Sequence, residues 1–117
     1  MAKNNVYAHS LALSLPVPAG TKSGDAVKVG DLVGVAITDA ASTTNWGGGN
    51  PVGNASVALD GTWLLDVAGA VTQVGSKVYI TDAGAVTATA SGNTAFGEAL
   101  DLKDSAAAPI RVKLIKN

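Results

Sequence analysis

The sequence predicts a mainly β protein: a small β-sandwich or β-barrel of about eight short strands with little or no helix. Apolar residues alternate with small or polar ones over short stretches, and turn-forming residues separate these stretches. No stretch of 11 or more residues shows the 3.6-residue period of an amphipathic helix. The chain is 47% hydrophobic but only 4% aromatic. Its core must therefore consist mainly of Val, Leu, Ile and Ala, which bury less area per residue than aromatic rings.

The clearest strand lies within residues 28–39, a tight turn followed by an alternating segment. Val33, Val35 and Ile37 share one face by the two-residue period of a pleated strand. A shortened copy of this stretch occupies residues 74–83. Both copies contain Val-Gly-x-x-Val and end in Ile-Thr-Asp-Ala. This echo predicts two related β units.

The remaining expected strands follow the same alternation. They cover residues 8–15, 55–59, 62–67, 77–81, 85–90, 96–102 and 110–114, and residues 104–108 are expected to form a short helical turn or a loop. Pro16 and Pro18 should end the first strand, because proline cannot donate to a ladder. Asp60-Gly61 predicts a type I′ hairpin turn joining 55–59 to 62–67, since such a turn needs positive φ at both positions.

Length and composition predict one domain with a mobile arm. At 117 residues the chain has the size of one domain with a radius of gyration of roughly 13 Å. We expect an N-terminal arm at residues 1–7, which is polar and without period, and a single β domain at 8–117. The glycine-rich loop 40–54 should be flexible or wrap around something. The small-residue core favours oligomerisation.

Charge and cysteine content argue against several functional classes. The net charge is −1 and only 15% of the residues are charged, so we expect no strong field for nucleic acid or an anionic membrane. No apolar run reaches the length of a membrane-spanning helix, about 18 residues. Residues 1–5 lack the apolar middle of a signal peptide. The chain contains no cysteine, which excludes disulfides, thiolate metal sites and thiol catalysis. We therefore expect a protein made in the cytoplasm.

Catalytic and cofactor motifs are not found. The single histidine, His9, is interpreted as a strand-end residue, and the aspartates lie mainly at turns, where they hydrogen-bond their own backbone. Residues 20–23 (Gly-Thr-Lys-Ser) lack the glycine spacing and the following helix of a phosphate-binding loop. The sequence therefore predicts no enzyme, no metal and no cofactor. Trp63 is expected in the core, whereas Trp46 could anchor in its own core or contact a partner.

Several motifs follow one another in an order that resembles the capsid cement, or decoration, proteins of tailed bacteriophages. They are Met-Ala-Lys-Asn at 1–4, Ser-Gly-Asp at 23–25, and the segments 29–36, 57–63, 75–79, 85–89, 96–99 and 110–114. The resemblance covers nearly the whole chain, although the loop at 46–51 is longer and richer in glycine than in typical members. The recombinase label sometimes given to this family has no support in these residues.

The resemblance implies a non-enzymatic protein that binds the outside of an assembled phage head, commonly as a homotrimer. Its partners would be the major capsid protein and copies of itself, with no nucleic acid and no membrane. On this interpretation the protein is made in the host cytoplasm and stabilises the shell against expansion stress and internal DNA pressure. The expected capsid contacts are Lys3, Asn4, Asn5, Tyr7 and Trp46.

A second interpretation is a receptor- or glycan-binding module on a virion surface. In that case Trp46 or Tyr79 would stack on a sugar ring. An enzyme is the weakest interpretation, given one histidine and no cysteine.

Overall fold

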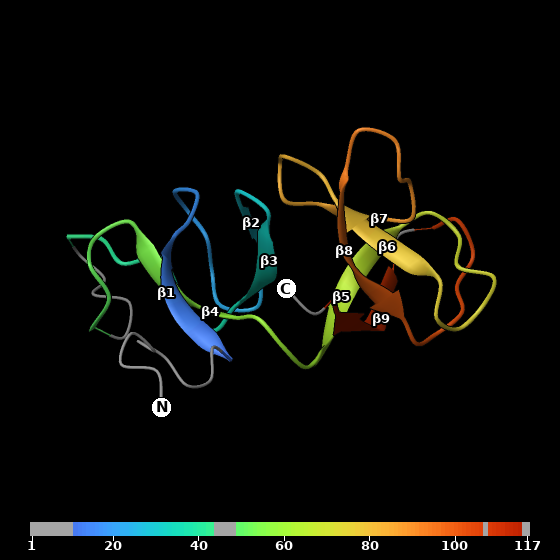
Figure 1. The fold of residues 1–117 in the computed structure, drawn as a ribbon, viewed down its shortest axis with the longest axis horizontal. Helices are drawn as coiled ribbons and strands as arrows, with labels where there is room; N and C mark the ends of the chain where they lie inside the picture. Colours follow the sequence, from blue (N-terminus) through green and yellow to red (C-terminus); the bar gives the residue numbers. More distant parts are fainter. Residues whose placement is uncertain (1–10, 44–48, 107, 116–117) are drawn as a thin grey trace, which may run out of the picture.

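The structure is a computed structural model, which describes residues 11–43, 49–106 and 108–115. It is mainly β, as predicted, with nine strands in two sheets (Figure 1). The strands are β1 (Ala12–Pro16), β2 (Ala26–Val29), β3 (Leu32–Ala36), β4 (Asn54–Ala58), β5 (Thr62–Ala68), β6 (Lys77–Ile80), β7 (Val86–Thr87), β8 (Thr94–Ala99) and β9 (Ala108–Leu114). The first four form an open sheet and the last five a small closed barrel.

The open sheet has the strand order β1-β4-β3-β2, and neighbouring strands in it are antiparallel. β2 and β3 form a hairpin in which Val29 pairs with Leu32, so the loop is only Gly30-Asp31. Gly30 has φ +60° and Asp31 does not have positive φ. Glycine at the first of two loop positions is the signature of a type II′ turn. β2 was not predicted, because residues 28 and 29 were assigned to the tight turn that precedes the strand.

The barrel has the order β5-β7-β6-β8-β9 and closes through the long antiparallel β5–β9 pair. On its other side β5 pairs in parallel with β7, and only at Val67 and Ala68. β7 is much shorter than the predicted strand 85–90, and β8 ends earlier than the predicted 96–102. The β5–β7 seam is therefore only two residues long.

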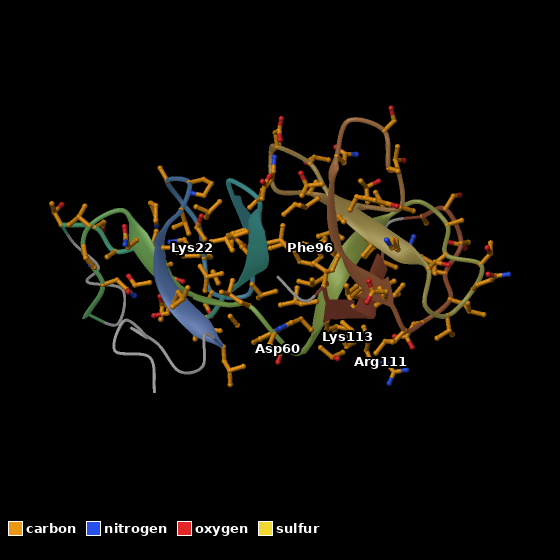
Figure 2. All side chains as sticks on the ribbon, in the orientation of Figure 1. Lys22, Asp60, Phe96, Arg111 and Lys113 are labelled. Atoms are coloured by element: carbon orange, nitrogen blue, oxygen red, sulfur yellow. The ribbon has the colours of Figure 1, made fainter. Side chains whose placement is uncertain are left out.

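A β-bulge in β8 brings the single phenylalanine into the barrel. The register on β6 shifts between Val78, opposite Gly97, and Tyr79, opposite Ala95, which leaves Phe96 as the extra residue. Phe96 and Gly97 are consequently both buried, although strict alternation would expose one of them. The bulge thus places the Phe96 ring, fully shielded from solvent, at the centre of an otherwise aliphatic core (Figure 2).

Two hydrophobic clusters form the core, and β3 contributes to both. Val33 and Val35 pack with the barrel side chains, including Phe96. Ala36 belongs to a second, smaller cluster in the open sheet, with Val27, Val57 and Leu59. In Figure 1 β3 is the strand of the open sheet nearest the barrel. The strand predicted within residues 28–39 therefore joins the two sheets.

The predicted hairpin at Asp60-Gly61 is wrong. β4 pairs with β1 and β3, whereas β5 pairs with β9 and β7, so the segment between them crosses from one sheet to the other. Gly61 has φ +102°, but Asp60 does not have positive φ, so a type I′ turn does not form. The Leu59 N–H instead donates to the Leu11 carbonyl, and the Leu114 N–H donates to the Gly61 carbonyl. The crossing is stabilised by these distant partners.

Other differences are smaller. Ile37, expected on the buried face with Val33 and Val35, lies beyond the end of β3 and is 43% exposed. Residues 104–106 contain no helical turn, which agrees with the loop alternative. The radius of gyration is 14.9 Å, larger than the roughly 13 Å expected for a compact domain of this length. The difference arises because the open sheet and the barrel lie side by side (Figure 1). The division into an arm at 1–7 and a single domain at 8–117 stays a prediction.

Gly97 gives a test of barrel closure. A Cβ at this position would collide with the Lys113 carbonyl of β9 and lie 3.1 Å from Val112 Cγ1. Backbone cannot yield as a flexible side chain can, so we expect Gly97→Ala to lower the free energy of unfolding by about 3 kcal/mol. Gly75→Ala is the comparison: Gly75 has φ +90° with open space around it, and should cost about 1 kcal/mol from backbone strain alone. Urea unfolding measures both, and equal losses would contradict the close approach.

Candidate interaction surface

The five contact residues predicted from the sequence all lie outside the described residues, as does His9. They are Lys3, Asn4, Asn5, Tyr7 and Trp46, and their assignment stays a prediction. Trp63, predicted in the core, is partly buried and packs against the barrel cluster, while its indole N–H donates to the Asp60 carbonyl. Tyr79 is half-buried on β6 and lines neither of the two grooves described below.

A groove of about 510 Å³ lies between the open sheet and the barrel. Residues 24–26, at the start of β2, line it from the open sheet. Residues 64–66 and Ala68 of β5, the 84–86 segment and Pro109 line it from the barrel. Most of these side chains are small or apolar, and Leu64 is 68% exposed. The fold thus leaves an apolar groove where its two sheets meet, which we call the inter-sheet groove.

A second, smaller hollow of about 350 Å³ shares Asp25, Ala26 and Gly84 with the inter-sheet groove. Lys28 and Asp82 also line it, and their side chains form an ion pair with Nζ and Oδ1 2.6 Å apart. The hydrogen bond and the charge of Lys28 hold the pKa of Asp82 below its usual value. This ion pair connects β2 with the turn after β6, so it joins the two sheets directly.

The repeated Ile-Thr-Asp-Ala motif places each of its aspartates against a lysine of the segment before β3. Asp82, from the second copy, pairs with Lys28, and Asp39, from the first copy, lies 3.9 Å from Lys22 Nζ. Asp39 also accepts a hydrogen bond from the Ser23 N–H. Asp39 therefore stabilises the loop before β2, and Asp82 holds β2 itself against the barrel. No sequence signal indicated these pairings, because the partners lie up to 54 residues apart.

A further ion pair lies on the outer face of the barrel between the end of β8 and β9. The Arg111 guanidinium donates to both carboxylate oxygens of Asp101, and the Arg111 backbone N–H donates to Oδ2. The side-chain hydrogen bonds from Arg111, followed by the backbone one, lower the pKa of Asp101 to about 2. The same pairing raises the pKa of Arg111. Asp101 thus fixes the chain that leaves β8 against β9.

The described part of the chain offers surfaces for contact more clearly than it offers a reaction centre. Within residues 11–43, 49–106 and 108–115, no three His, Cys, Asp or Glu side chains are grouped so that they could hold a metal ion. The same residues include no helix long and apolar enough to cross a membrane. Ion pairs hold loops onto the sheets, and the inter-sheet groove presents apolar side chains and backbone.

Comparison with known protein families identifies the family of this chain. The family model described as "Phage cement protein" matches residues 7–114, nearly the whole sequence. The chain therefore belongs to the phage cement protein family, as its motifs had indicated, and this family is a structural component of the phage capsid. No curated protein and no solved structure gave a match.

The Asp101–Arg111 pair predicts a specific acid response. The pKa of Asp101 is lowered in the folded state, so its contribution to stability is present above the unfolded value, near 3.9, and is lost as the pH falls toward about 2. Asp101→Asn should therefore lose less stability between pH 5 and about 2 than the parent chain does. Asp31→Asn, at an exposed carboxylate in the β2–β3 turn, is the control. Urea unfolding across this range measures the effect, and parallel curves for Asp101→Asn and the parent would contradict it.

Proposed function

We propose that this protein decorates the outside of an assembled phage head, as homotrimers, and stabilises the shell against expansion stress and internal DNA pressure. The observation that carries the proposal is membership of the phage cement protein family over residues 7–114. The partners are the major capsid protein and copies of this chain, and the protein is made in the host cytoplasm. The net charge of −1 supports a role without nucleic-acid or membrane binding.

The proposed action is non-covalent binding, without catalysis. A ligand that binds the expanded shell more tightly than the disrupted one stabilises the shell by mass action. A trimer presents three equivalent contact surfaces, so the second and third contacts form at high effective concentration and multiply a modest affinity by about 10²–10⁴. The aliphatic cores support this, because small side chains give a small subunit limited stability of its own and packing against copies adds to it.

Native mass spectrometry followed by mixing with heads tests this function. We expect the free protein to have the mass of three chains of 11.5 kDa and to sediment with expanded empty heads of its phage. Unexpanded heads are the control and should bind less protein. A free protein that does not sediment with expanded heads, or that binds glycans on an array instead, would contradict the proposal.

The N-terminal arm is proposed as a capsid contact. We expect deletion of residues 2–7 to abolish binding to heads while the trimer and its circular dichroism spectrum stay unchanged. A matched control replaces residues 2–7 with glycine and serine, which keeps the length and removes Lys3, Asn4, Asn5 and Tyr7 together. If heads bind the deleted chain at unchanged occupancy, the arm is not a contact.

A further inference from the structure

One edge of β5 has no described partner strand over most of its length, and it borders the inter-sheet groove. The Leu114 N–H of β9 donates a hydrogen bond to the Gly61 carbonyl. In an antiparallel pair every second residue is hydrogen-bonded to the partner strand, so residues 63, 65 and 67 of β5 also face β9. Thr62 and Leu64 therefore direct their N–H and C=O groups away from β9. On that side β7 pairs with β5 only at Val67 and Ala68. The described structure gives the Thr62 and Leu64 backbone groups no hydrogen bond.

The edge of β2 borders the same groove from the open sheet. The Ala36 N–H donates to the Asp25 carbonyl. Two residues further along, Val27 of β2 and Gly34 of β3 form the next hydrogen-bonded pair. By the same alternation Ala26 and Lys28 turn their backbone groups away from β3. The Ala26 carbonyl faces Gly84, since a Cβ there would be 3.6 Å from it. Two strand edges thus contribute residues to a single groove, with Ala26 from one and Leu64 from the other.

We propose that the inter-sheet groove is a strand-acceptor site, in which an extended segment of a capsid subunit adds to the edge of β5. This inference rests on the proposed function and names the partner's chemistry at one site. Extended segments bind exposed sheet edges through main-chain hydrogen bonds, and side-chain pockets give the selectivity. The opposite edge of the open sheet, β1, ends at Pro16, whose nitrogen cannot donate.

The charges in the groove select the segment. Asp25 and Asp66 line it, and no Lys or Arg does. Asp25 also accepts a hydrogen bond from the Lys22 N–H. On the barrel, Arg111 lies opposite Leu64 on β9 and is paired with Asp101. The site should therefore accept a lysine or arginine flanked by small apolar residues, which would contact Leu64 and Pro109.

Proline at position 64 tests the backbone part of the proposal. Leu64 and Arg111 form a non-hydrogen-bonded pair of the β5–β9 ladder. Leu64→Pro therefore removes an N–H that faces the groove and leaves the hydrogen bonds of this ladder intact. Leu64→Ala is the matched control, because it removes a similar apolar contact and keeps the N–H. We expect Leu64→Pro to bind expanded heads about tenfold more weakly than Leu64→Ala.

Charge reversal tests the side-chain part. Asp66→Lys should weaken binding to heads by about tenfold or more, whereas Asp31→Lys, which changes the net charge equally outside the groove, should bind like the parent. Hydrogen exchange measured by mass spectrometry is the second readout. The Leu64 amide should gain protection on the head, while that of Trp63, bonded to β9, should be protected before and after.

The outcomes separate the two proposals. A parent chain that does not bind expanded heads contradicts the proposed function. A parent chain that binds, together with Leu64→Pro and Asp66→Lys variants that bind equally well, overturns the groove alone. If Leu64→Pro does not fold, as judged by circular dichroism, Asp66→Lys and the Leu64 amide decide: no weakening and no gain in protection would overturn the strand-acceptor site.

Discussion

The packing of β3 against both hydrophobic clusters is the constraint on which the rest of the structure depends. Val33 and Val35 enter the barrel core, while Ala36 on the opposite face enters the core of the open sheet. Between them Gly34 lies so close to β4 that a Cβ would be 2.8 Å from Val57 Cγ1 and would collide with the Ala58 carbonyl. A strand buried on both faces cannot slip by one residue without exchanging its two sets of side chains. The register of β3 therefore fixes how the open sheet meets the barrel, and with it the groove between them.

The groove depends on two irregular features of the barrel, the bulge in β8 and the short β5–β7 pair. The bulge at Phe96 and the absence of a side chain at Gly97 let β8 turn inward and approach β9 closely. On its other edge β5 pairs with only two residues of β7, so the barrel is barely closed there. The open sheet lies beside the rest of this edge, and the Val33 and Val35 side chains of β3 pack in the barrel core. The interior is thereby shielded, while Leu64 of β5 stays exposed beside the groove.

The period-two pattern predicted the strands whose one face is buried, because burial imposes that pattern directly. β5 and β9 were found for this reason, and so were Val33 and Val35. The pattern could not predict which strands pair. Asp60-Gly61 has the local chemistry of a hairpin, yet hydrogen bonds with Leu11 and Leu114, both about 50 residues away, decide the outcome. β2 carried a usable signal in the glycine of its two-residue turn. No sequence signal indicated the inter-sheet groove, since its lining residues lie on segments that only the tertiary fold brings together.

An unpaired strand edge is a hazard for a protein present in many copies, because edges of different molecules pair with one another. In this chain the edge of β5 lies in a groove between two sheets, with Asp25 and Asp66 among its lining residues. Another copy carries the same two carboxylates at the same edge, so approach of the two edges brings like charges together. A free extended segment with a basic residue meets no such repulsion. The arrangement thus disfavours self-association through this edge and favours a single strand from another protein. Under the proposed function, copies of this chain therefore stay apart at this edge until a capsid segment occupies it.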